Sequence, residues 1–176
     1  GFAETQISTA ELTAIAFSRG PGSFSGVRIN AAVTQALAWS HDVPVIPVST
    51  LQALAQAAYR LEGLTAVTAV LDARMNEVYI ASFELDIQEI MQAVDQEQLL
   101  NYSDAAQVVR FQLVGSGAGL FDLEQIHYKG LSASAQVIAT IARVCAQQQQ
   151  WVSAEQALPV YLRDNAWKKI PEQGKA

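Results

Sequence analysis

Glycine and serine crowd the stretch FSRGPGSFSGVRI, residues 17 to 29, which lies between an apolar run and a segment of helical composition. Its glycines permit positive φ angles, and a serine, Ser23 or Ser25, can cap a helix that begins near Gly26. Free N–H groups at the start of a helix favour an anion such as phosphate. The candidate residues for an anion site here are Gly20, Gly22, Ser23 and Gly26.

This motif differs from the common phosphate-binding loops. A P-loop is excluded because one residue too many separates Gly20 from Gly26, and Val27 stands where the lysine belongs. The dinucleotide-binding pattern is also missed, since serine fills its last position. Two interpretations stay open, a compact strand-to-helix corner and a weak anion site.

Two further places offer chemistry. A second glycine turn, GSGAG at 115 to 119, can admit a phosphate or nucleoside through Gly115 and Gly117. Asp72, Arg74 and Glu77 crowd a tight polar turn, where they form either a local ion pair or part of a cleft.

Histidine and cysteine give weaker signals. His41 and His127 are far apart and have no ligand-spaced partner, which argues against a metal site. Cys145, the single cysteine, falls inside a helical pattern, where a thiol behaves as a small apolar side chain. The residues alone therefore indicate no self-sufficient active site.

Composition limits the remaining possibilities. The 176 residues are 51% apolar, enough for one domain or two small ones. No apolar run reaches the roughly 20 residues of a membrane span, no signal peptide is visible, and a lone cysteine favours the cytoplasm. The net charge of −6 argues against binding nucleic acid alone. A local exception is the basic C-terminal tail with Arg163, Lys168, Lys169 and Lys175 near Trp167.

The first part of the chain predicts two strand-helix units. Residues 13 to 18 and 43 to 49 read as strands, each followed by a helix. Ser49 can cap the second helix, Gly63 can end it, and its apolar face is Leu51, Leu54, Ala55 and Ala58. Successive units of this kind imply a parallel sheet.

The second part of the chain has a β-rich pattern. Residues 66 to 73 and 77 to 85 predict an antiparallel hairpin, with Tyr79, Ala81 and Phe83 on one side and Val78 and Ile80 on the other. We expect only a variable surface region at 86 to 110, with a modest helix capped by Ser103. A strand before the second glycine turn, an amphipathic helix containing Val137, Ile141, Val144 and Cys145 inward, and a last strand at 159 to 163 complete an α/β chain.

Several segments together resemble one family. FSRGPGSFSGVRI, VIPVSTLQALA, LDARMNEVYIASFE, VGSGA and ALPVYLRDNAWKK follow one another as in TsaB (YeaZ), bacterial proteins of tRNA threonylcarbamoyladenosine modification. The resemblance covers nearly the whole chain except residues 86 to 110.

The resemblance implies an ASKHA fold, the actin, Hsp70 and sugar-kinase type with a ribonuclease H-like core. Such proteins have two related domains with mixed sheets. Residues 1–63 would be the remainder of the N-terminal domain, 64–158 the C-terminal domain, and 159–176 a tail returning to the first. Because family members begin with strands and a helix not present here, we expect a fragment that lacks about 40 to 45 residues, leaving the first domain incomplete.

The resemblance also implies a role without chemistry. TsaB proteins pair with TsaD, which carries the metal and the transfer reaction, recruit TsaE, and support modification of adenosine 37 in ANN-decoding tRNA. Alone they homodimerise, and tRNA is met only through the complex. We therefore expect no cofactor, no metal, no catalytic residue and no membrane contact. The expected structural or interface residues are Arg28, Ala32, Ala36, Asp72, Arg74 and Glu77.

The alternative is an enzyme in its own right, either an ATPase or a glycoprotease-like protein of the same superfamily. Asp72 and Glu77 are the carboxylates near a glycine turn that would serve it. A vestigial nucleotide cleft at the two glycine turns fits either reading.

Overall fold

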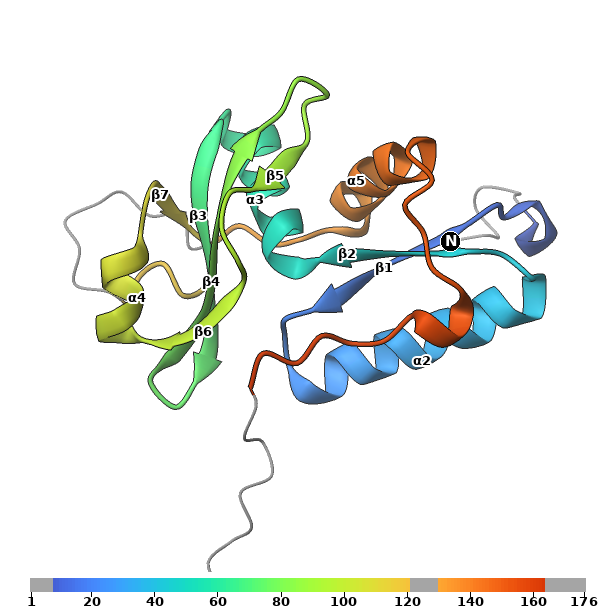
Figure 1. Ribbon diagram of the computed structural model, residues 1–176, viewed down its shortest axis with the longest axis horizontal. Coiled ribbons are helices and arrows are strands. Elements are labelled where there is room, and N and C mark those ends of the chain that lie inside the picture. Colours follow the sequence, from blue (N-terminus) through green and yellow to red (C-terminus); the bar gives the residue numbers. More distant parts are fainter. Residues whose placement is uncertain (1–7, 121–129, 164–176) are drawn as a thin grey trace, which may run out of the picture.

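Two sheets lie side by side in the computed structural model, which describes residues 8–120 and 130–163 (Figure 1). The first sheet pairs β1 (Ile15–Gly20) with β2 (Val45–Ser49) in parallel, as the strand-helix pattern predicts. The second has the order β5-β4-β3-β7, and β6 also pairs with β4.

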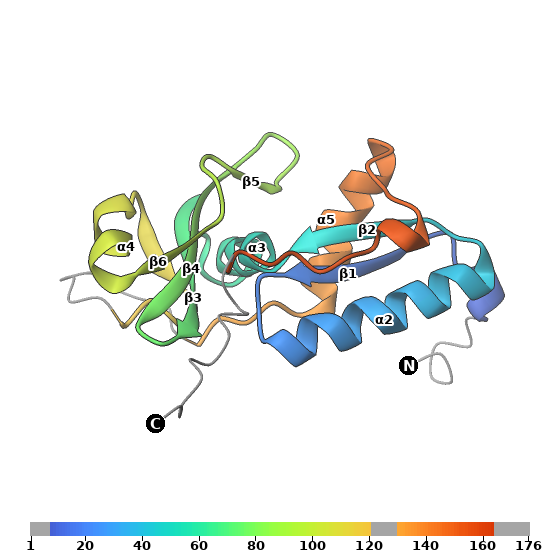
Figure 2. The ribbon, with the colours of Figure 1, turned by 60° about the horizontal axis from the view of Figure 1, so that its bottom comes forward.

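Helices cover both faces of the first sheet. The helix α2 (Phe24–His41) packs on one face against Phe17 and Val45, and α5 (Ala135–Gln147) packs on the other against Ile46 and Val48 (Figure 2). Alternate strand residues point to opposite faces, so the same two strands supply both cores. The short turns η1 (Thr9–Glu11) and η2 (Ala154–Gln156) flank this half.

The second sheet is built on the predicted hairpin of β3 (Ala66–Arg74) and β4 (Glu77–Leu85). Its other strands are β5 (Met91–Ala93), β6 (Gln98–Asn101) and β7 (Gln112–Val114), the last parallel to β3. The helix α3 (Thr50–Glu62) covers the face with Ala81 and Phe83, and α4 (Tyr102–Val108) covers the face with Val78 and Ile80. The predicted division of the hairpin into two faces is confirmed.

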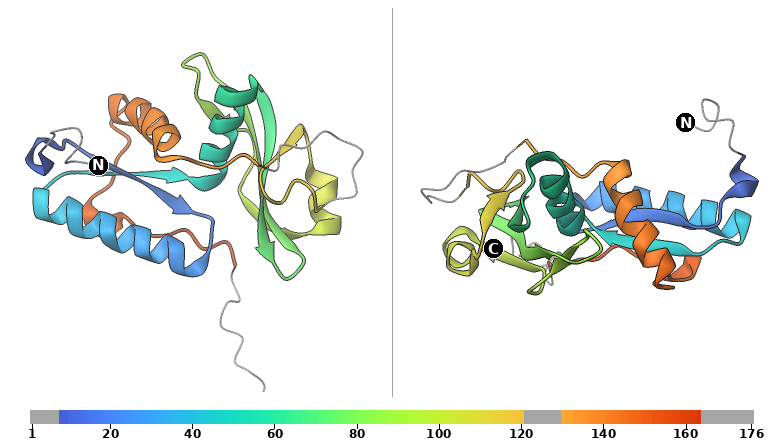
Figure 3. Two further views of the ribbon diagram at one scale, coloured as in Figure 1. Left: turned by 180° about the vertical axis from the view of Figure 1, so that it is seen from behind. Right: turned by 90° about the horizontal axis from the view of Figure 1, so that it is seen from above.

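Helix α3 connects the halves. Its predicted apolar face, Leu51, Leu54, Ala55 and Ala58, packs on the second sheet, whereas Ala53 and Ala57 contact the core under α5 (Figure 3). Ser49 caps α3 and Gly63 ends it in the left-handed conformation, both as expected. The division at 1–63, 64–158 and 159–176 stays a prediction. In the structure α3 packs on the sheet of the second range and α5 on the sheet of the first.

Three sequence predictions are wrong. Residues 86 to 110 are more than surface, because β5 and β6 lie there and Ile90, Met91 and Ala105 are buried, although the modest helix expected in this range is present as α4. The cap of α4 is Asn101, whose side chain accepts from Asp104 N at 2.9 Å, rather than Ser103. Residues 159 to 163 form no strand. Their described link to β1 is a single hydrogen bond from Val160 N to Arg19 O, too little for a ladder.

Among the described residues, no helix is both long and apolar enough to cross a membrane.

Candidate functional site

The carboxyl ends of β1 and β2 meet at the edge of the first sheet that faces the second sheet (Figure 1). In α/β proteins ligands bind outside this edge. Both strands lead directly into helices, and each helix has a serine cap: Ser23 Oγ accepts from Gly26 N at 3.3 Å, and Ser49 Oγ accepts from Gln52 N at 3.2 Å. Thus α2 begins at Phe24, two residues before the expected start.

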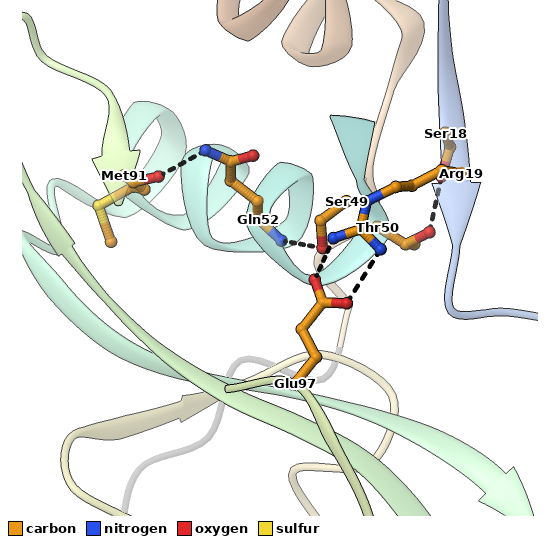
Figure 4. Close-up of polar contacts among 7 residues, drawn as sticks. All are labelled: Ser18, Arg19, Ser49, Thr50, Gln52, Met91 and Glu97. Atoms are coloured by element: carbon orange, nitrogen blue, oxygen red, sulfur yellow. Dashed lines mark hydrogen bonds and ion pairs between the residues drawn. The ribbon is translucent and has the colours of Figure 1, made fainter. Parts of the chain in front are cut away.

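Polar side chains at this edge bind one another (Figure 4). Arg19 forms two hydrogen bonds of 3.1 Å to the two oxygens of Glu97, which comes from the second half of the molecule. The hydroxyls of Ser18 and Thr50 lie 2.6 Å apart. The sequence reasoning missed Arg19 and Glu97, because 78 positions separate them and only the fold brings them together.

The glycines of the first loop allow close packing. Gly20 has a φ of +99°, and a Cβ there would lie 3.2 Å from Val160 O. A Cβ on Gly22 would lie 3.3 Å from Val27 Cγ1, and one on Gly26 would lie 2.6 Å from Ser23 Oγ. Of the two glycines that permit positive φ, Gly20 uses it and Gly22 does not. Anion binding by this loop stays a prediction.

The second glycine turn is packed even more tightly. Gly115 has a φ of +104°, and a Cβ there would clash with Leu54 Cδ2 and Val70 O. A Cβ on Gly117 would lie 2.6 Å from Val70 Cγ1, and Gly117 N donates to Val70 O at 3.1 Å. This turn therefore presses against β3 and α3. A nucleoside role for Gly115 and Gly117 stays a prediction.

The hairpin turn contains the local ion pair, one of the two interpretations that the sequence left open, and a role in a cleft stays a prediction. Arg74 lies 3.5 Å from Asp72 and its backbone N–H donates to the same carboxylate at 2.8 Å, which is the local ion pair. Glu77 instead pairs with Arg163 at 2.6 Å, in an ion pair whose geometry is too poor for a hydrogen bond. Arg163 also donates to Ala73 O at 3.2 Å, so the C-terminal segment is fixed to the hairpin.

The remaining candidates are divided between described and undescribed parts of the chain. His41 ends α2 and contacts Ser40 Oγ at 2.6 Å. Cys145 is half-buried on α5, and burial raises the pKa of its thiol, which keeps it protonated at neutral pH. His127, Trp167, Lys168, Lys169 and Lys175 lie outside the described residues.

The outward face of α2 carries apolar side chains that nothing in the described structure covers. Ile29 is 64% exposed and Val33 54% exposed, and Leu37 lies on the same side one turn further on. Ala32 and Ala36, expected at an interface, lie on this face and are exposed. The opposite face, with Val27 and Ala38, is buried in the core. We call the set Ile29, Ala32, Val33, Ala36 and Leu37 the outer stripe.

An aromatic cluster stands at the N-terminal end of the same helix. The guanidinium of Arg28 lies 3.5 Å from the ring centroid of Phe24 and donates to Tyr161 Oη at 2.8 Å. All three side chains are exposed. Arginine and aromatic residues of this kind contribute most to binding energy at protein interfaces.

Comparison with known proteins gives the family. Residues 2–174 match the model of the TsaD family, described as tRNA N6-adenosine threonylcarbamoyltransferase. The TsaB protein of Haemophilus influenzae, a tRNA threonylcarbamoyladenosine biosynthesis protein, is 38% identical over 92% of this chain and 75% of its own. The Escherichia coli TsaB is 36% identical over 93% and 77%. This chain belongs to the TsaD family, among its TsaB proteins.

Solved TsaB-type structures agree with this assignment. YeaZ from Pseudomonas aeruginosa superposes with a TM-score of 0.86 at 36% identity, covering 92% of this chain and 79% of that one. A second structure, titled as similar to peptidase YEAZ and from the same organism, gives 0.85 at 36%. The TsaB resemblance and the α/β fold with mixed sheets are therefore confirmed.

Two of the charged residues described above, Arg19 and Asp72, are paired in this TsaB-family chain: Arg19 is bound by Glu97, and Asp72 by Arg74. In the ranges 8–120 and 130–163, no three His, Cys, Asp or Glu side chains gather at a metal-binding distance. The exposed apolar face of α2 is a surface that a binding partner can cover.

Proposed function

We propose that this chain acts in tRNA threonylcarbamoyladenosine biosynthesis as a non-catalytic partner subunit of a TsaD-type transferase. The assignment of its TsaB relatives to this biosynthesis supports the pathway. The observation that supports a binding role is the outer stripe of α2, an apolar helix face without a described partner.

The energetics of α2 favour docking. A surface helix of a stable monomer has one apolar face, whereas α2 is apolar on both. Burying a large aliphatic side chain that is about half exposed gains about 1 kcal/mol, so Ile29, Val33 and Leu37 together offer about 3 kcal/mol. Two exposed alanines between them allow a second helix to approach closely, and the Phe24, Arg28 and Tyr161 cluster extends the same surface.

The pairing of the polar groups supports a role without chemistry. The carboxylates that an ATPase or protease would need, Asp72 and Glu77, are held by Arg74 and Arg163.

The proposal includes the further partners that the family resemblance implies. In the absence of TsaD the outer stripe pairs with a second copy of the chain. TsaE joins the complex, tRNA is contacted only within it, and all of this takes place in the cytoplasm.

The test measures binding to TsaD from the same organism by isothermal titration. Ala32→Arg and Ala36→Arg place a charge in the stripe, and each should weaken binding about 100-fold, because an unpaired buried charge costs about 3 kcal/mol or more. Ala139→Arg on α5 makes the same change on another exposed helix and should bind as the wild type does. Wild-type chain that fails to bind TsaD, or stripe variants that bind normally, would contradict the proposal.

A further inference from the structure

A hollow of about 460 Å³ lies beside the C-terminal end of α2, away from the carboxyl edge of the sheet and its glycine loops. One wall is the end of α2 and the turn into β2, with Trp39, Asp42 and Pro44. The other wall is formed by the segment that leads into η2, with Trp151, and by η2 itself, with Glu155. Figure 1 shows η2 beside this part of α2, and Ala38, Ala154 and Ala157 pack together beneath it.

Two tryptophans at this hollow are unusually open to solvent. Trp39 is 69% exposed and Trp151 is 45% exposed. Exposing a large aromatic side chain to water is less favourable than burying it, so two exposed tryptophans at one hollow indicate a binding surface. The π-face of an indole is the best aromatic partner for a cation.

The charges at the hollow have one sign. Asp42 and Glu155 line it, its lining has no basic residue, and within the described chain neither carboxylate forms an ion pair. His41, next to Asp42, is outside the lining and contacts Ser40. A hydrogen bond with the Ser153 side chain lowers the pKa of Glu155, so that carboxylate is ionised at neutral pH.

The backbone adds to this negative field. The 18-residue helix α2 ends at His41, and the last carbonyls of a helix carry a partial negative charge that favours a cation. An anion, or a nucleic-acid backbone, would be repelled here. A bare metal ion has too few ligands, since no three potential ligand side chains gather in the described residues.

We propose that this hollow binds an organic cation, a guanidinium or alkylammonium group, between Trp39 and Trp151 and opposite Asp42 and Glu155. The aromatic faces contact the hydrocarbon and delocalised parts of the cation, while the carboxylates neutralise its charge. The volume accommodates the side chain of arginine or lysine, or a small quaternary amine. This inference does not rest on the TsaD partnership, because it concerns a different part of α2.

The test follows tryptophan fluorescence in a Trp167→Phe background, which leaves Trp39 and Trp151 as the emitting residues. The first probe is N-acetyl-arginine methylamide, and its neutral control is the citrulline analogue, which has nearly the same shape without the charge. The second probe is choline, which represents a free small-molecule cation, and its neutral control is 3,3-dimethyl-1-butanol. Sodium chloride at matched ionic strength corrects for screening.

We expect saturable binding of either cation, and we expect its neutral analogue to bind at least threefold more weakly. Tighter binding of the arginine probe indicates a side chain of a protein, and tighter binding of choline indicates a small molecule. Asp42→Asn with Glu155→Gln should raise the Kd of the better probe about tenfold, and Trp151→Leu about threefold. Glu62→Gln, a carboxylate on α3 outside the hollow, should leave Kd unchanged.

Two results would overturn the inference. One is a fluorescence change that stays linear for both cations. The other is equal affinity for each cation and its neutral analogue, which would mean simple apolar contact. Asn is compatible with the φ of +50° at Asp42, so that variant is expected to fold, and circular dichroism verifies it.

Discussion

The ion pair between Arg19 and Glu97 connects the two sheets, and it should contribute measurably to stability. Arg19 is the next-to-last residue of β1, and Glu97 directly precedes β6, so the bond spans the junction of the halves (Figure 4). Arg19→Met and Glu97→Met remove the charges and retain much of the side-chain volume. The double variant removes both charges, so neither is left unpaired.

The expected coupling energy follows from geometry and exposure. Both hydrogen bonds are 3.1 Å, and the side chains are 26% and 13% exposed. Fully exposed pairs contribute up to about 1 kcal/mol, whereas breaking a buried pair costs about 3 to 5 kcal/mol. A bidentate pair between these limits should couple by about 1.5 kcal/mol. The double variant should therefore destabilise the protein by about 1.5 kcal/mol less than the sum of the two single variants.

Urea unfolding of the wild type, both single variants and the double variant gives this coupling energy through a double-mutant cycle. Arg110 and Asp95 are a suitable comparison, since their closest atoms are 3.6 Å apart and Arg110 is 57% exposed. Their coupling should be under about 0.5 kcal/mol. If Arg19 and Glu97 couple no more strongly than this second pair, the ion pair does not hold the sheets together.

Three other predictions follow from the structure. Gly115→Ala should destabilise the fold by about 3 kcal/mol or more in urea, because it combines strain at positive φ with a backbone clash, whereas Gly130→Ala, where a Cβ meets nothing within 4 Å, should change little. Burial raises the pKa of Asp86, but hydrogen bonds from Ile90, Gln92 and Gln88 lower it overall. The contribution of Asp86 to stability is therefore present above about pH 4 and is lost as the pH falls. Asp86→Asn should make the free energy of unfolding depend less on pH in this acidic range. Titration with ATP and Mg²⁺ should show binding weaker than micromolar, and a micromolar or tighter constant would revive the nucleotide reading of the glycine turns.

Local structure was predictable where the signal lies within a few residues. The cap at Ser49, the end at Gly63 and the two faces of the β4 strand follow from spacing alone. The strands β5 and β6 are three and four residues long and carry polar side chains, so no alternating pattern marks them. Their positions depend on pairing with β4, which a local pattern does not contain.

The packing of the helices on the two sheets was harder to predict from the sequence. Helix α3 falls in the range 1–63 that was assigned to the first domain, but most of its apolar face packs on the second sheet. Helix α2 is apolar on two opposite faces, so periodicity could not tell which of them is buried. Only the positions of Phe17 and Val45 beneath Ala31 and Ala38 decide it. Ala32 and Ala36 were expected at an interface from the sequence. The exposure of Ile29, Val33 and Leu37 beside them and the Arg19–Glu97 pair were findings of the fold.

The outer stripe has a consequence for self-association. The buried face of α2 already fills the core, and no residue in 8–120 or 130–163 covers the other face, so the apolar free energy of that face is available to a second molecule. A second copy and TsaD would cover the same residues, so the two complexes exclude each other. Adding TsaD should convert a homodimer of the chain into a heterodimer without a larger intermediate, as measured by light scattering after size exclusion. Ala36→Arg should prevent both complexes. A variant that loses one complex and retains the other would show that the two surfaces are separate.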